Sequence, residues 1–98
     1  MSSISPEVLA SYAADAAREV PGVDDLVGNA LHRHGGVKIG RETEGTAVEV
    51  HLALAWGASA AAVGTEVQER VTDMLARMAD LRPLTVEVVV EEFRPPVR

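Results

Sequence analysis

The segment from Thr46 to Trp56 alternates strictly between two kinds of side chain, and this alternation constrains the fold more than any other feature. One set is aliphatic and ends in tryptophan: Val48, Val50, Leu52, Leu54 and Trp56. The other set is small or polar: Ala47, Glu49, His51, Ala53 and Ala55. Successive side chains of a strand point to opposite faces of a sheet, so the pattern predicts a long strand with one packed face and one wet or lightly covered face. We expect the aliphatic set in the core, Trp56 included.

One helix is predicted before this strand in the sequence and another after it. Ser5 followed by Pro6 and Glu7 is typical of a helix start, and Pro21-Gly22 ends that helix. Ser59 is a suitable N-cap for a second helix running to about Ala79. Apolar residues follow helical spacing in both segments and predict which side is buried. They are Val8, Leu9, Tyr12, Ala13, Ala16 and Val20 in the first, and Ala60, Val63, Val67, Val71, Met74, Leu75 and Met78 in the second.

Two further strands are expected, at Val37 to Gly40 and at Leu84 to Phe93. The charged stretch from Arg41 to Gly45 is typical of a hairpin loop, and we interpret Val23 to Gly36 as a loop with room for one helical turn. The order is then α-β-β-α-β, an α+β two-layer sandwich in which a three-stranded sheet carries two helices on one face. The last strand can lie beside either the long strand or the short one.

Length and composition indicate one domain, over residues 1–98, with residues 94–98 as an extended tail. The 98 residues are 47% apolar and 24% charged, which is globular composition, and there is no cysteine to form a disulfide or a thiolate site. We find no signal peptide and no apolar run long enough to span a membrane, so direct membrane insertion is not expected. The formal net charge of −6 disfavours nucleic acid, since phosphate binding requires clustered Lys and Arg.

Histidine and carboxylate residues are the candidates for chemistry. His32 and His34, with His51, have metal-ligating side chains, but no carboxylate stands at a spacing that completes a tetrahedral site, so we expect exposed loop histidines and no metal or other cofactor. Glu49, His51, Glu87 and Glu91 should share the outer face of the sheet, and a carboxylate beside an imidazole can perform acid–base catalysis. Because no nucleophile or cofactor motif accompanies them, we expect no enzyme, and a metal-dependent or acid–base enzyme remains the less favoured alternative.

That outer face is the candidate protein-contact surface. It is expected to be flat and partly apolar, and it consists of Glu49, His51, Ala53, Glu87, Val89 and Glu91. Trp56, if it lay exposed at the end of the sheet in place of the core, would be a contact anchor of the kind found at interfaces. Gly57 after it indicates a backbone angle or a close approach that a side chain would block.

An RNA-binding module of the KH type is the alternative from another functional class, because it is also a small helix–sheet domain. KH modules clamp the nucleic-acid backbone with a Gly-x-x-Gly loop. No two of the eight glycines in this chain are three positions apart. Together with the acidic balance, this leaves a protein partner as the favoured reading, with a homo-oligomer through sheet edges or the open face as one form of it.

Several segments taken in order resemble the alkaline shock protein family of Gram-positive bacteria. Ile4 to Leu9 is similar to the family's opening helix start, and Ala16 to Val23 to its helix end with Glu-Val leading into Gly-Val. Val48 to Gly57 resembles the central strand ending in an aromatic residue and glycine. Val63 to Val71, with its Val67-Gln68 pair, and Val86 to Val90 resemble the following helix and closing strand. The segment after Val23 is shorter than in most members.

This resemblance implies a cytoplasmic protein of the cell-envelope or general stress response, in a family without an agreed enzymatic activity. It further implies a partner that is a small membrane-embedded protein, through which such a domain associates with the membrane.

Overall fold

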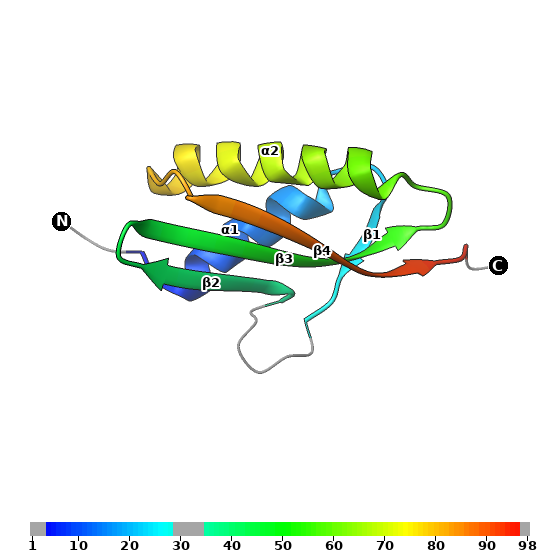
Figure 1. Ribbon diagram of the computed structural model, residues 1–98, viewed down its shortest axis with the longest axis horizontal. Coiled ribbons are helices and arrows are strands. Elements are labelled where there is room, and N and C mark those ends of the chain that lie inside the picture. The colour runs from blue at the N-terminus through cyan, green and yellow to red at the C-terminus, as the bar shows by residue number, and fades with distance from the viewer. Residues whose placement is uncertain (1–3, 29–34, 97–98) are drawn as a thin grey trace.

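A computed structural model describes residues 4–28 and 35–96 of the chain as two helices and four strands (Figure 1). In chain order these are α1 (Pro6–Arg18), β1 (Val23–Leu26), β2 (Val37–Glu42), β3 (Gly45–Ala55), α2 (Ala60–Ala79) and β4 (Thr85–Arg94). Figure 1 shows both helices on one side of a single sheet, so the predicted α+β two-layer sandwich is confirmed. The sheet has four strands where three were predicted.

Strand β3 is the centre of the sheet. β4 runs parallel to it and pairs with residues 47–55, and this settles the position that the sequence left open for the last strand. β1 and β2 both run antiparallel to β3, β1 against residues 52–54 and β2 against residues 45–50. Because β4 pairs with these same parts of β3, β1 and β2 must share the opposite edge. The extra strand therefore lengthens one side of a sheet that is three strands wide.

Strand β1 lies at the start of the segment predicted as a loop, so that prediction was wrong for Val23–Leu26, while residues 29–34 of the segment lie outside the described residues. Main-chain bonds hold the segment to the end of β3: the N–H of Ala55 donates to the carbonyl of Gly22 (2.8 Å), and the N–H of Val27 donates to that of His51 (3.0 Å). The strand carries Asp24 and Asp25 on exposed positions and buries only Leu26 fully. A strand this short and acidic has no alternation to reveal it, and it forms because β3 offers an unpaired edge.

Both helices begin at the predicted caps. The Oγ of Ser5 accepts from the N–H of Val8 at 3.3 Å, and that of Ser59 from the N–H of Ala62 at 3.2 Å. Most of the predicted buried positions are confirmed. The exceptions are Val8 and Met78, in terminal turns, which are 40% and 51% exposed, and Ala60, which is also exposed.

The core lies between the helices and the inner face of the sheet. The even-numbered residues of β3 are almost completely inaccessible, as predicted: Val48, Val50, Leu52 and Leu54. They pack against an alanine-rich face of α1 and against the valines of α2. The core residues of the two helices are Leu9, Ala10, Ala13, Ala14, Ala16, Ala17, Val63, Val67, Val71 and Leu75. Small α1 side chains let that helix lie close to the sheet.

The ends of the outer strands depart from prediction. β2 continues to Glu42, so only Thr43 and Glu44 form the turn before β3. β4 begins at Thr85, leaving Leu84 46% exposed, and continues through Arg94, so the tail starts at Pro95. A bulge also interrupts its pairing, since Leu52 pairs with Val90 but Ala53 with Glu92.

Trp56 is not in the core, and the prediction that it continues the inward row was wrong. Its side chain is 68% exposed. β3 ends at Ala55, and the chain turns immediately through Gly57, whose φ is +89°. A Cβ built on Gly57 would meet nothing within 4 Å, so this glycine is needed for its backbone angle and not for a close approach.

Candidate functional site

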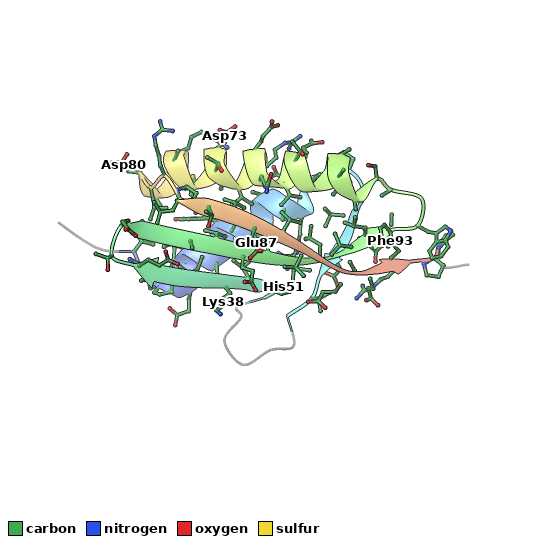
Figure 2. The ribbon with its side chains drawn as sticks, viewed as in Figure 1. Lys38, His51, Asp73, Asp80, Glu87 and Phe93 are labelled. Carbon is green, nitrogen blue, oxygen red and sulfur yellow. The ribbon has the colours of Figure 1, made fainter. Side chains whose placement is uncertain are left out.

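The outer face of the sheet, opposite the helices, is built from rows of side chains that cross the strands. One row joins Lys38, Glu49 and Glu87, and the next places His51 beside Val89. Figure 2 labels Lys38, His51 and Glu87 on three neighbouring strands, β2, β3 and β4. The structure thus brings together the residues that the alternation of β3 and β4 placed on this face.

His51 is the most enclosed polar residue of this face, at 8% exposure. Its Nδ1 lies 2.5 Å from an Oε2 of Glu91, and its Nε2 lies 2.5 Å from an Oε2 of Glu49. Glu91 lies two residues beyond Val89, the register neighbour of His51, at the point where regular pairing of β4 with β3 is interrupted. The imidazole therefore connects β3 to β4 on the outer side of the sheet.

The His51 contacts limit what this group can do chemically. A neutral imidazole donates from one ring nitrogen only, so two carboxylate contacts require one further proton, either on the second ring nitrogen or on a carboxyl group. Both nitrogens contact carboxylates of the same chain. The arrangement is that of a structural bridge, although its residue types are those used in acid–base catalysis.

Ala53 is fully buried even though it lies on the outer face. Its neighbour in register on β1 is Asp25, and that of Ala55 on β4 is Arg94. The guanidinium of Arg94 crosses the outer side of β3, with Nη1 at 3.3 Å from Asp24 and 3.6 Å from Asp25. Only small side chains on β3 leave room beneath this crossing, which accounts for the two alanines.

Arg94 is the central cation of an acidic group. Its Nε donates to Glu92 at 2.8 Å, on the same strand. This hydrogen bond and the charge of Glu92, followed by the bond and charge of Asp24, raise the pKa of Arg94 above its already high usual value. Sequence reasoning missed this group because Arg94 was assigned to a tail and Asp24 and Asp25 to a loop. The only sequence signal was the acidic pair itself.

The remaining predicted site residues are placed as follows. Glu87 is exposed and Val89 half-buried, both on the outer face. Glu87 borders an open depression of about 290 Å³, whose lining residues are Lys38, Gly40, Glu42, Ala47, Val48, Glu49, Thr85 and Glu87. His32 and His34 lie outside the described residues. Within residues 4–28 and 35–96, no three His, Cys, Asp or Glu side chains are arranged to hold a metal ion.

Trp56 marks one end of the outer face. A hollow of about 620 Å³ beside its indole is lined by Asp24, Ala55, Trp56, Arg94, Pro95 and Pro96. The N–H of Trp56 donates to the carbonyl of Arg94 at 3.0 Å, so the main chains of β3 and β4 hold the tryptophan next to the prolines. Phe93, on the opposite face of β4 from Arg94, is 41% exposed. Large apolar side chains therefore gather where β3 and β4 end.

These features define a small α+β domain whose helices cover one face of the sheet. Side-chain hydrogen bonds and ion pairs connect the strands on the other face, and aromatic side chains lie at one end of it. The profile of the alkaline shock protein 23 family, described as having a cell envelope-related function, matches residues 2–95. The chain belongs to this family, which confirms the resemblance found in the sequence. No helix in the described part of the chain combines the length and apolarity needed to cross a bilayer.

Individual relatives agree with this assignment. The uncharacterized protein YqhY of Bacillus subtilis (strain 168) is 33% identical over 102 residues, covering 92% of this chain and 76% of that protein. Two solved structures of MamM CTD variants, one of them a zinc form, are 15% identical, with TM-scores of 0.57 and 0.58. The two matches cover 88% and 94% of this chain, and 84% and 96% of the respective MamM CTD chains. At this identity the likeness is one of fold alone.

Proposed function

We propose that this chain is a non-enzymatic protein-binding domain that serves as an adaptor in a cell envelope-related stress function. The observation that carries the proposal is the exposure of Trp56, 68% of whose side chain is accessible. Tryptophan buries more apolar surface on binding than any other residue and is among the residues most enriched in interaction hot spots. It is the only tryptophan of the chain, and its position is fixed by the main chain of two strands.

The surroundings of Trp56 favour a protein partner. The hollow beside it combines the indole and two proline rings with the charged groups of Asp24 and Arg94. An apolar centre next to polar groups is the usual composition of a protein interface. The outer face continues from this hollow and supplies polar positions at Glu49, Glu87 and Glu91, so the contact surface proposed from the sequence adjoins the tryptophan.

Two observations favour binding over catalysis or nucleic-acid recognition. Both ring nitrogens of His51 contact carboxylates of the same chain, so the imidazole has no nitrogen left to exchange a proton with a substrate. The net charge of −6 opposes a phosphate backbone. The family description supports an envelope-related role. Within the proposal, the domain works in the cytoplasm and reaches the membrane through a small membrane-embedded partner.

Affinity capture with matched variants tests this function. The wild-type chain, Trp56→Ala and Met78→Ala are coupled to beads and exposed to lysate of the native cells, including detergent-solubilised membranes. Met78 is the control because it is also a large exposed apolar residue, 51% accessible, but lies at the far end of α2. We expect a protein that is retained by wild type and Met78→Ala and reduced at least about tenfold by Trp56→Ala. Retention of RNA, or of a protein that binds wild type and Trp56→Ala equally, would contradict the proposal.

A further inference from the structure

Strand β4 has one paired edge and one open edge. It pairs with β3, and across residues 4–28 and 35–96 no strand lies on its other side. The Nε2 of Gln68, on α2, donates to the carbonyl of Val86 at 3.0 Å, which shows that this carbonyl points away from β3. Main-chain groups of alternate residues in a strand share a direction, so Val86, Val88 and Val90 present their N–H and C=O groups to the open edge.

The side chains of the same three valines are incompletely covered. Val86, Val88 and Val90 face the helices but are only half-buried, whereas Val48, Val50 and Leu52 beside them on β3 are at most 1% exposed. A hollow of about 440 Å³ lies between α2 and β4, lined by Ala60, Ala61, Gly64, Thr65, Gln68, Val88 and Val90. The inner row of β4 therefore lacks a neighbour on its open side.

We propose that a second copy of this chain occupies this edge, its β4 pairing antiparallel with β4 about a twofold axis at Val88. Val88 then faces its own symmetry mate, and Val86 faces Val90 of the second copy. All three pairs join residues whose main-chain groups already point to the open edge, so each pair exchanges two hydrogen bonds. The two sheets become one, and the half-buried valines of both copies close over each other. Gln68 releases the carbonyl of Val86 in this pairing.

The charges of β4 favour this register over the two adjacent ones. An axis at Glu87 would place Glu87 opposite Glu87 of the second copy, and an axis at Val89 would place Glu87 opposite Glu91. Like charges directly opposite each other are destabilising. An axis at Val88 places Glu87 opposite Val89 of the second copy. The bulge at Glu91 prevents registers centred farther along the strand, because regular pairing ends there.

A second copy fits this edge better than an unrelated strand. Residues 85–90 read Thr-Val-Glu-Val-Val-Val and contain no lysine, proline or bulge, the features that protect natural edges from pairing. A twofold pairing occupies the β4 edges of both copies at once, so this contact closes at a dimer. This contact is centred on the open edge of β4 and does not include Trp56, so either proposal can fail while the other stands.

Single cysteines test the register directly, since the natural chain has none. Glu87→Cys and Val89→Cys are prepared separately, mixed, and oxidised mildly. Positions 87 and 89 of opposite copies are then direct neighbours at about 4.5–5.5 Å between Cβ atoms, whereas 87 to 87 and 89 to 89 are diagonal, at about 7–8 Å. We expect the mixture to form at least about ten times more disulfide-linked dimer than either variant alone. Cross-linking of either separate variant as strong as that of the mixture, or no cross-linking in the mixture, overturns the proposed register.

Charge substitutions at Val89 supply a second measurement on a residue outside the core. Val89→Lys places a lysine opposite Glu87 twice per dimer, and Val89→Glu places a glutamate there. Sedimentation over a range of concentrations should show the dimer dissociation constant lowered about threefold to tenfold by lysine and raised by a similar factor by glutamate. Trp56→Ala should leave the dimer dissociation constant unchanged. A wild-type chain that remains monomeric at about 1 mM, or a shift in the same direction for both variants, refutes the dimer.

Discussion

Arg94, the last residue of β4, reaches across the full width of β3 to Asp24 in β1, with 3.3 Å between Nη1 and Oδ2. The contact joins the two outermost elements at this end of the sheet through side chains alone. β1 is only four residues long and pairs irregularly with β3, so few main-chain bonds hold it in place. The arginine is thus the link between the aromatic end of the domain and its shortest strand.

We predict that Arg94→Met loosens β1 and leaves the rest of the fold intact. Each ion pair of Arg94 is partly exposed and contributes little to global stability. Loss of all of them removes the side-chain anchor of β1, so amide hydrogen exchange should accelerate at Leu26 and Val27 and stay constant at Val50 and Leu52. Arg82→Met, at an exposed arginine between α2 and β4, is the control. Unchanged exchange in β1 would show that Arg94 does not hold it.

The face assignment of β3 predicts opposite outcomes for two carboxyl substitutions. Leu52 is fully buried, so Leu52→Asp places an unpaired charge in the core and should cost several kcal/mol, about 4 or more, which is enough to unfold the domain. Glu87 is exposed on the outer face, and Glu87→Gln should change stability by less than about 0.5 kcal/mol. Urea unfolding followed by circular dichroism measures both. Two equally harmless substitutions would invalidate the assignment.

His51 should stabilise the fold by separating two carboxylates. His51→Ala removes the shared partner of Glu49 and Glu91 and is expected to cost about 1–2 kcal/mol in the free energy of unfolding. Adding Glu49→Gln to that variant removes one of the two facing charges and should recover part of the loss. The same Glu49→Gln change in the wild type should destabilise, because it replaces a charged acceptor beside the imidazole by a neutral amide. If Glu49→Gln acts alike in both backgrounds, the bridge is not energetically coupled.

The glycines that turn the chain should differ in their tolerance of alanine. Gly57→Ala meets no neighbour and incurs only the strain of a positive φ, about 1 kcal/mol. Gly22→Ala has a similar strain, at φ +98°, and its Cβ would lie 2.8 Å from a methyl group of Val63. We therefore expect a larger loss for Gly22→Ala, about 2–4 kcal/mol, measured as the difference in unfolding free energy. Equal losses would mean that Val63 moves aside without cost.

The sequence predicted the parts of the fold that repeat with a fixed period. The alternation of β3 identified its buried row, and the capping serines located both helices. Trp56 was misplaced because alternation says nothing about where a strand ends, and the turn at Gly57 redirects the last side chain of the row. The bulge at Glu91 could not be foreseen either, since it depends on the pairing of β4 with β3. That bulge shifts the residues after it, so that Glu92 and Arg94 pair in register with Ala53 and Ala55 of the outer face, and the shape of this end of the face follows from tertiary pairing.

β1 and the Arg94 group illustrate the same limit. Asp24 and Asp25 are typical of turns, and no local pattern distinguishes them from loop residues. They become a strand because β3 is longer than β2 and leaves residues 52–54 unpaired on that edge. Arg94 then finds two carboxylates that are distant in sequence. Such a group can be recognised only after the strand order is known.

Photo-cross-linking at position 56 in the native cells is the most direct test of the proposed function. A photoreactive phenylalanine analogue replaces Trp56, and the same analogue at Met78 serves as the control. We predict one discrete adduct of higher mass from position 56 that protease removes and nuclease does not, with no such adduct from position 78. An adduct removed by nuclease, or no adduct from position 56 in cells where the chain is folded and functional, would contradict it.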